Sequence, residues 1–584
     1  MKELLLRFKK FQKSKWFPYF CWFWLGLFNT LAFLPWKLSH FVWLSPFALF
    51  WLEKYYRGRW KKLIWHGLSA GVTTTVFSYF WMNHLLQVFG GFPFLISFIL
   101  FILYAFVTNT RYAVFLVLFS FLRKRLKKNL FLLSGFCILV AELFTFQLFP
   151  YYFGNLIGGS LILSQNVEIT GVYGLSALVF IVSYFLFRIL ENPNIINRIV
   201  KRKRFTLIKV PALALVYFFI QGTILYIYWS RVEPIASKNV IMIQPNAPLE
   251  FRDGREKETL DELMERIEAL AIKAAIDIKP DIIVLPESAV PFFSTHKSDA
   301  TMYFNRSYYE RFESLIYLLS NRFKANVYFN EIDAMFVNNE VNRKNQRFYN
   351  SSAVFNPNGE RGESYYKSYL LAFGEYFPLG ETFPILYDLV PQVARFLPGT
   401  EQKLLSYYDT KEELPKFDKS HIRWTETNWM NLDSIKKHYE SYRIDLKESG
   451  KFLPLICYEV IIPEFVRKFA NAGNPDFIIN ITNDKWYGKS METFQHLELA
   501  RFRSIELRRW MVRSTNSGTS VYVDHLGRVL NNRFTGQETS EYYSAKIDVI
   551  HSSPTFYARF GNLVPYTYMV IFAFFSVWTY WKKK

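Results

Sequence analysis

Three side chains that can do chemistry each follow a short apolar run in the second half of the chain. Glu287 comes after residues 281–285, Lys367 follows two tyrosines, and Cys457 follows residues 453–456. A cysteine thiol needs a base to become nucleophilic near neutral pH, because a free cysteine titrates at about 8.5. The tetrahedral oxyanion that forms on attack needs a positive group beside it. A carboxylate, an ammonium and a thiol together therefore predict acyl transfer through a cysteine thioester.

Each of these residues also has a plainer interpretation when it is taken alone. Glu287 can be a loop or helix-capping carboxylate, Lys367 a solvated lysine, and Cys457 a small buried packing residue. The three lie far apart in the chain, so only a folded domain can bring them together. Their spacing is a weak pattern, and the local sequences around them have to decide between the two interpretations.

The elements that must position these residues lie between residues 230 and 558. Short apolar runs alternate there with amphipathic stretches, which indicates a layered α/β domain. The predicted strands cover residues 240–243, 281–285, 326–329, 352–355, 453–456, 477–481 and 519–523. Helical spacing predicts helices over residues 256–278 and 494–511. Residues 400–450 are charged and without a clear period, so we expect an inserted surface excursion near 400–450.

The rest of the chain is apolar and aromatic. Aromatic residues make up 19% of the sequence, and many lie at the ends of apolar runs, where amphipathic rings settle at a bilayer interface. Eight apolar runs are found at about 16–34, 41–52, 63–88, 92–122, 129–149, 170–190, 206–229 and 562–581. The sequence therefore predicts a polytopic helical membrane protein with about eight spans.

The positive charges of the sequence lie mainly between the apolar runs. The net charge of +21 is concentrated in short clusters between the apolar runs, at residues 9–15, 57–62, 123–128, 201–204 and 582–584. Such clusters mark the cytoplasmic side of a membrane, and no nucleic-acid-binding motif accompanies them. We expect a membrane domain over 1–229, an extracytoplasmic domain over 230–558, and a final span with a basic tail over 559–584. Both termini are then cytoplasmic, and nucleic acid is not a partner.

Cysteine usage limits the chemistry further. Cys457 is the only cysteine between residues 230 and 558, so that domain can form neither an internal disulfide nor a cysteine-based zinc cluster. The other two, Cys21 and Cys137, lie within apolar runs. The sequence indicates no metal and no cofactor.

The local sequences around the three residues resemble those of the carbon–nitrogen hydrolase, or nitrilase, superfamily. The matching segments are Leu285-Pro286-Glu287-Ser288, Tyr365-Tyr366-Lys367, Phe373-Gly374-Glu375-Tyr376-Phe377-Pro378 and Cys457-Tyr458-Glu459, with further matches at 169–174, 349–352, 480–488, 495–501 and 513–518. With the predicted spans around them, nearly the whole chain resembles the apolipoprotein N-acyltransferase family.

This resemblance implies a fold and a set of roles. It implies an αββα sandwich between the seventh and eighth spans, with Glu287 as general base, Lys367 as oxyanion stabiliser and Cys457 as nucleophile. Glu375, Tyr458 and Glu459 match supporting positions of the family, although Glu459 can equally be a structural ion-pair partner.

Three further aromatic residues are candidates for substrate binding. Trp486 and Tyr487, like residues 291–293 and 376–398, are candidates for an apolar rim that receives acyl chains, with core packing as the alternative. The family commonly has a tryptophan where this chain has Phe251 as the nearest match, which leaves an indole-specific contact in doubt.

The resemblance implies an acyltransferase of the bacterial inner membrane. Cys457 takes a fatty acyl group from a phospholipid and passes it to the free N-terminal amine of diacylglyceryl-cysteine on apolipoproteins, and we expect a monomer. One alternative is a membrane-anchored amidase that passes the acyl group to water. The others are a scaffold with a degenerate domain, and a transporter in which Glu142 is the clearest acidic residue of the spans.

Overall fold

The structure is a computed structural model of the whole chain. It describes residues 2–584 except 34, 37, 89, 127–128, 193–205, 250–258, 305, 338–339, 343–344, 390–392, 411–430, 551 and 582–584. The chain divides into two compact units. A helical unit comprises Met1–Arg231, Phe494–Glu506 and Thr555–Lys584, and an α/β unit comprises Val232–Thr493 and Leu507–Pro554.

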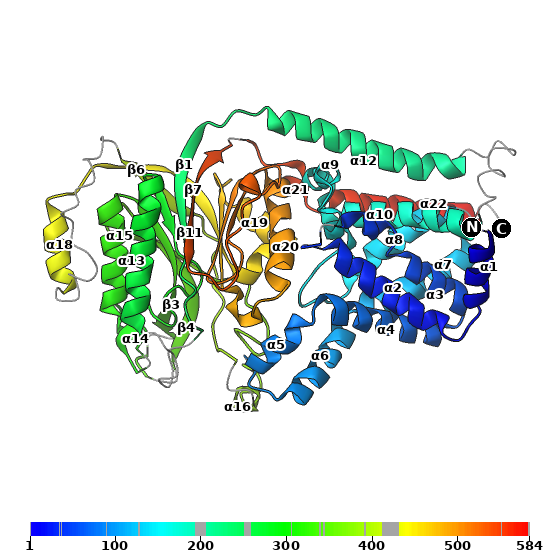
Figure 1. Cartoon of the computed structure of the whole chain (residues 1–584), viewed down its shortest axis with the longest axis horizontal. Helices are drawn as coiled ribbons and strands as arrows, with labels where there is room; N and C mark the ends of the chain where they lie inside the picture. Colours follow the sequence, from blue (N-terminus) through cyan, green and yellow to red (C-terminus); the bar gives the residue numbers. More distant parts are fainter. Residues whose placement is uncertain are drawn as a thin grey trace. The chain divides into compact units, whose positions relative to one another are not determined.

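The α/β unit contains two sheets (Figure 1). The six-stranded sheet has the order β11-β1-β2-β3-β4-β5, and the five-stranded sheet has the order β10-β9-β8-β7-β6. Their strands are β1 (Ala236–Gln244), β2 (Ile282–Val284), β3 (Asn326–Phe336), β4 (Gln346–Phe355), β5 (Arg361–Tyr366), β6 (Leu405–Thr410), β7 (Leu446–Ile456), β8 (Ile478–Thr482), β9 (Met511–Thr515), β10 (Val521–Val523) and β11 (Glu541–Val549). Strands β1, β2 and β3 are parallel neighbours, as are β7, β8 and β9.

Helices cover the outer face of the six-stranded sheet. In Figure 1, α13 (Leu260–Asp277) and α15 (Glu310–Phe323) lie side by side against it. The apolar stripe of each helix packs with the buried strand residues in one core, which also takes in α18 (Leu432–Glu440). The described residues of this unit also form α14 (Asp299–Met302), α16 (Ile385–Leu389) and α19 (Pro463–Ala470), with short 3₁₀ turns η4 (Cys457–Ile461), η5 (Asp484–Tyr487) and η6 (Leu530–Asn532).

The inner faces of the two sheets meet. Tyr522 of β10 donates a hydrogen bond of 2.8 Å to the Val240 carbonyl of β1, and the ring of Tyr328 in β3 packs edge-on against Phe452 in β7, with centroids 5.0 Å apart. Each sheet therefore buries one face against the other, as in an αββα sandwich.

Two sequence predictions differ from the structure in this unit. The helix predicted over 494–511 is α20 (Glu492–Leu507), and β9 already begins at Met511. Arg508 has a left-handed backbone (φ 53°), a conformation that ends a helix, so the apolar pattern beyond it belongs to a strand. Within the predicted excursion at 400–450, β6 pairs with β7, and Leu432, Ile435 and Tyr439 of α18 are buried in the core. Residues 411–430 of that stretch are not described.

The helical unit is built mainly from apolar helices. They are α1 (Lys2–Phe11), α2 (Phe17–Ala32), α3 (Phe47–Tyr56), α4 (Trp60–Ser78), α5 (Trp81–Val88), α6 (Phe94–Thr108), α7 (Thr110–Arg125), α8 (Leu130–Phe144), α9 (Leu161–Ser164), α10 (Val167–Glu191), α12 (Thr206–Ser230), α21 (Phe556–Phe560) and α22 (Leu563–Trp581), with 3₁₀ turns η1 (Ser39–Trp43) and η2 (Phe153–Ile157). Three stretches of the described residues are long and apolar enough to cross a membrane, namely Phe94–Arg125, Val167–Glu191 and Val210–Ser230.

Two of the eight predicted apolar runs each form two helices. The run at 92–122 breaks at Asn109, whose side-chain amide donates to the Ala105 carbonyl (2.9 Å) and to the Thr75 hydroxyl (2.7 Å) and so competes with the helix ladder. The run at 63–88 breaks after Ser78, between α4 and α5. The count of eight spans stays a prediction, and the basic clusters at 201–204 and 582–584 lie outside the described residues.

Close packing of α4 against α7 depends on two glycines spaced four apart. A Cβ atom on Gly67 would lie 2.6 Å from the Ala113 Cα, and one on Gly71 would lie 2.4 Å from the Asn109 Cβ. Small residues at this spacing let two helix backbones approach, which is how apolar helices associate without a hydrophobic driving force between them.

Candidate active site

Lys367 lies between two carboxylates directly after β5. Its Nζ atom is 2.8 Å from both Glu375 carboxylate oxygens and 3.8 Å from Glu287 Oε1, and its side chain is 2% exposed. The Lys367 backbone N–H donates to the Asn350 carbonyl of β4 (2.8 Å), which fixes the start of the segment that carries Glu375. Burial opposes the charge on Lys367, but Glu375 and then Glu287 raise its pKa above the ordinary lysine value. The ammonium is therefore a permanent positive charge.

Glu287 follows β2 and Pro286 at a sharp turn, where Ser288 has a left-handed backbone (φ 56°). Its Oε1 accepts a hydrogen bond from the Asn350 amide (2.9 Å), and its Oε2 accepts one from the Asn483 backbone N–H (3.0 Å). Burial raises the pKa of Glu287, and the charge of Lys367 offsets this only in part. A buried carboxylate with a raised pKa is suited to take up a proton near neutral pH.

Cys457 is the first residue of η4, directly after β7. It has a left-handed backbone (φ 52°), an unfavourable conformation for a residue with a Cβ atom that is retained where the surrounding structure enforces it. The negative charge of the Glu287 carboxylate acts on its thiol. Burial, together with the negative charge of Glu287, raises the pKa of the Cys457 thiol well above its usual value. The sulfur is therefore a neutral thiol at rest, and a base has to remove its proton as it attacks.

Glu459 is the third carboxylate of this region. Its Oε1 accepts hydrogen bonds from the Tyr365 hydroxyl (2.7 Å) and from the backbone N–H groups of Ser368 (2.9 Å) and Tyr369 (3.0 Å). Its Oε2 accepts one from the Ile456 N–H (2.9 Å). Burial raises the pKa of Glu459 to about 7. Its direct partners are hydrogen-bond donors on both sides of the site, rather than the ion-pair partner that the sequence left open.

The other predicted site residues have different positions. Tyr458 is buried, and its ring lies 5.8 Å from that of Tyr369. Trp486 is half-buried and Tyr487 is buried, both in η5, which begins one residue after Asn483. Phe251 lies outside the described residues.

Asn350 and Asn330 are site residues to which the sequence assigned no role. Asn350 donates one hydrogen bond to Glu287 and another to Glu375 Oε1 (2.8 Å), and Asn330 in turn donates to the Asn350 side-chain oxygen (2.7 Å). Both are amides in the middle of otherwise buried strands. A buried polar side chain within a strand needs hydrogen-bond partners, so the sequence could have indicated these two asparagines on that ground.

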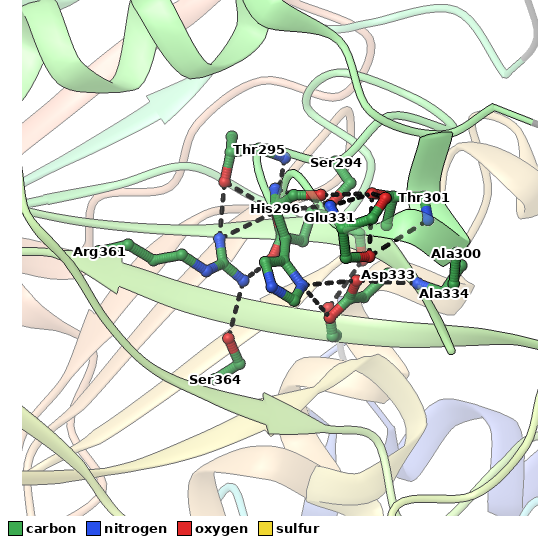
Figure 2. A network of polar contacts seen from close by, with 12 residues as sticks. Ser294, Thr295, His296, Ala300, Thr301, Glu331, Asp333, Ala334, Arg361 and Ser364 are labelled. Atoms are coloured by element: carbon green, nitrogen blue, oxygen red, sulfur yellow. Dashed lines mark hydrogen bonds and ion pairs between the residues drawn. The ribbon is translucent and has the colours of Figure 1, made fainter. Parts of the chain in front are cut away.

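A second polar cluster includes side chains of β5, the strand that precedes Lys367 (Figure 2). The Tyr366 hydroxyl donates to Asp333 (2.7 Å), which also contacts His296 Nδ1 (3.0 Å). Arg361, at the start of β5, forms an ion pair with Glu331. These contacts hold β5 at both of its ends.

Comparison with known proteins identifies the family. Residues 242–552 match the family described as carbon-nitrogen hydrolase, and residues 25–185 match the apolipoprotein N-acyltransferase N-terminal domain. Apolipoprotein N-acyltransferase 2 of Leptospira interrogans serogroup Icterohaemorrhagiae serovar copenhageni is 49% identical over 581 residues, which cover 97% of this chain and 96% of that protein. The chain belongs to the apolipoprotein N-acyltransferase family.

More distant members of this family agree. Apolipoprotein N-acyltransferase 1 of the same Leptospira strain is 31% identical over 86% of each chain, and the apolipoprotein N-acyltransferase of Bdellovibrio bacteriovorus is 26% identical over 86% of this chain and 83% of that protein. A carbon-nitrogen hydrolase crystal structure from Helicobacter pylori is 14% identical, with a TM-score of 0.34 over 53% of this chain and 89% of that chain. The nitrilase-like fold rests on the family match and on the two packed sheets.

Proposed function

We propose that this protein moves a fatty acyl group from a phospholipid to the N-terminal amine of diacylglyceryl-cysteine on apolipoproteins, through a thioester on Cys457. The observation that carries the proposal is the meeting of three side chains: Lys367 Nζ lies 3.8 Å from Glu287 Oε1, and the charges of both residues act on the Cys457 thiol. The family membership gives the reaction class, and these contacts supply a base, a nucleophile and a positive charge for it.

The first half-reaction forms the thioester. Glu287 takes the thiol proton as Cys457 Sγ attacks the ester carbonyl carbon of the lipid. The oxyanion that develops is stabilised by the Lys367 ammonium and by backbone N–H groups at the start of η4, where Cys457 lies. The ester carbon–oxygen bond then breaks, the leaving alkoxide takes the proton back from Glu287, and lysophospholipid departs.

The second half-reaction forms the amide. The free amine attacks the thioester carbonyl carbon while Glu287 again accepts a proton. The carbon–sulfur bond breaks, and Glu287 returns that proton to the departing sulfur. Glu287 and Cys457 are thereby restored, as a ping-pong cycle requires.

An apolar segment beside the site is suited to receive acyl chains. Leu379, Phe383 and Ile385 are 55–69% exposed in the segment that follows Glu375, and Phe373 is also exposed. Their exposure supports a role in binding acyl chains over core packing, the alternative for residues 376–398. Exposed apolar side chains of this kind mark binding surfaces for apolar ligands.

Placement in the membrane is the second part of the proposal. The three stretches long and apolar enough to cross a membrane support a membrane location, and the distribution of lysine and arginine supports cytoplasmic termini with the α/β unit on the outer side of the inner membrane. On that side the unit meets the outer-leaflet phospholipid and the exported lipoproteins.

The test is mass spectrometry of the purified full chain after incubation with phospholipid vesicles. We expect an acyl adduct on Cys457 with release of lysophospholipid, and loss of the adduct when a synthetic diacylglyceryl-cysteine peptide with a free amine is added. An adduct lost equally fast in buffer alone would support an amidase instead. Absence of any adduct on Cys457 would refute the proposal.

A further inference from the structure

Two buried asparagines on neighbouring strands connect the backbone next to Glu287 with both carboxylates of the site. Asn330 lies on β3 and Asn350 on β4. The Ser288 N–H donates to Asn330 Oδ1 (2.9 Å), Asn330 Nδ2 donates to Asn350 Oδ1 (2.7 Å), and Asn350 Nδ2 donates to Glu287 (2.9 Å) and Glu375 (2.8 Å).

The direction of this chain of hydrogen bonds is fixed at its far end. A backbone N–H can only donate and a carbonyl can only accept. Asn330 therefore has to present its oxygen to the Ser288 N–H and its nitrogen to the Ser351 carbonyl (2.7 Å). The same nitrogen faces Asn350, so Asn350 has to present its oxygen to Asn330 and its nitrogen to the carboxylates. An amide nitrogen carries two hydrogens, one for each carboxylate.

We propose that Asn330 and Asn350 form a directed amide relay that holds the Glu287 and Glu375 carboxylates in place around Lys367 and favours the charged form of Glu287. Asn350 contacts the general base directly, and Asn330 is a positioning residue that acts through it. The inference rests on the proposed function, because it assigns a role only if Glu287 is the base.

The relay is needed because the site is short of positive charge. The titratable groups that interact with Glu287 include Lys367 and Glu375, from the segment after β5, Cys457, after β7, Tyr328 of β3 and Tyr487 of η5. Glu459 acts on Lys367 from the same turn as Cys457. Two carboxylates thus share one ammonium in a buried site. A hydrogen bond donated to a carboxylate favours its charged form, so Asn350 lowers the pKa of Glu287. Without that donor, Glu287 would hold a proton over a wider pH range and could not take one from Cys457.

The pH dependence of thioester formation tests the relay. We would measure the rate of adduct formation on Cys457 with p-nitrophenyl octanoate, a chromogenic acyl ester, between pH 5 and 9, using the full chain in detergent. Asn350→Leu, which has a similar volume and no donor, should move the acid limb of the profile upward by about one to two pH units. The rate below the limb should then fall about tenfold to a hundredfold, while the plateau at higher pH changes less.

Asn330→Leu should move the limb in the same direction by a smaller amount, because Asn350 keeps its contacts with the carboxylates but loses its orienting partner. Asn326→Leu is the matched control. Asn326 is buried on the same face of β3 four residues earlier, and its amide donates to the carbonyls of Asp281 (3.0 Å) and Tyr408 (2.8 Å). This variant should leave the limb where it is.

Three outcomes separate the possibilities. If Asn350→Leu slows the reaction by one factor at every pH and leaves the limb in place, the relay is wrong although the proposed function stands. If the limb of Asn326→Leu moves as far as that of Asn350→Leu, the effect is general destabilisation and the relay is again wrong. If the unchanged protein forms no adduct, the proposed function itself fails. Thermal unfolding confirms folding, and Asn350→Ala and Asn330→Ala replace any leucine variant that does not fold.

Discussion

Two carboxylate clusters lie near strand β5, and similar side chains behave differently in them. In the cluster of Figure 2, Glu331 is paired with Arg361, and Asp333 with His296 and the Tyr366 hydroxyl. At the candidate active site, Glu287 and Glu375 share the single ammonium of Lys367. Burial opposes ionisation in both places. His296 and Tyr366 nevertheless hold the pKa of Asp333 below its usual range, whereas the pKa of Glu287 is raised.

The difference lies in how many partners each carboxylate has. Glu331 Oε2 alone accepts hydrogen bonds from the Thr295 N–H (2.8 Å), the Thr295 hydroxyl (2.9 Å) and the Ser294 hydroxyl (3.2 Å). A carboxylate with its own cation and several hydrogen-bond donors is held in place by them and serves stability. A carboxylate that shares its cation and faces a thiol remains ready to accept a proton. The two clusters thus suggest that charge balance separates a structural carboxylate from a reactive one.

Removal of the sulfur should have the largest effect. Cys457→Ala should abolish acyl-adduct formation and lower transfer by at least about a thousandfold, because no other group at the site can form the thioester. Lysophospholipid release, followed by mass spectrometry, measures it. Cys137→Ala is the matched control, since Cys137 is also buried but belongs to α8 of the helical unit. Full transfer by Cys457→Ala would rule out the mechanism.

Removal of the base should have the next largest effect. Glu287→Gln keeps the side-chain shape and an acceptor for Asn350 but cannot take a proton, so adduct formation should slow by about 10²- to 10⁴-fold. Mass spectrometry of samples quenched at successive times measures this rate of adduct formation. Glu331→Gln changes a carboxylate of the other cluster and should leave the rate of the folded protein near its original value. Equal losses in the two variants would contradict the distinction between the clusters.

Restoring charge balance at the site should have a moderate effect. Glu375→Gln leaves one carboxylate for Lys367, and the negative charge that raises the pKa of Glu287 disappears. The acid limb of the pH profile should therefore move to lower pH, and the plateau rate should fall roughly tenfold because Glu287 becomes a weaker base. A limb that moves to higher pH would show that Glu375 acts on Glu287 in some other way.

The smallest effect concerns the stability of the other cluster. Asp333 raises the pKa of His296, so protonated His296 stabilises the fold fully below its unfolded-state pKa of about 6.5, and this contribution is lost as the pH rises through the higher folded-state value. The side chain is 41% exposed, which limits the contribution to less than about 1 kcal/mol. Unfolding temperatures at pH 6 and pH 8 should differ less in His296→Gln than in the unchanged protein. The same pH dependence in both would refute the assignment.

Much of the fold was predictable because its buried strands are apolar runs. The runs at 240–243 and 453–456 are parts of β1 and β7. Strand β5 has no apolar run, because most of its residues are polar and only Tyr365 is buried, and its position is set by antiparallel pairing with β4. The pattern of apolar residues cannot predict a strand such as β5, which is formed by its pairing with β4.

The residues of the candidate site also divide into those that the sequence could predict and those that it could not. Glu287, Lys367 and Cys457 could be chosen from their types and local sequences. The role of Asn350 could not, because it depends on the register in which Ser351 lies opposite Tyr366 and so puts Asn350 beside Lys367. Asn330 contacts neither Lys367 nor Cys457 and is recognisable only through the hydrogen bonds it makes to Asn350 and Ser288.

The four hydrogen bonds accepted by Glu459 have a consequence for how the sandwich opens. One carboxylate fastens the segment after β5, in the six-stranded sheet, to the end of β7 in the five-stranded sheet. The two sheets cannot slide past each other there without releasing the Tyr365, Ser368 and Tyr369 donors together. The amide hydrogens of Ser368 and Tyr369 should therefore exchange with deuterated solvent as one slow group, at the rate at which the two layers separate.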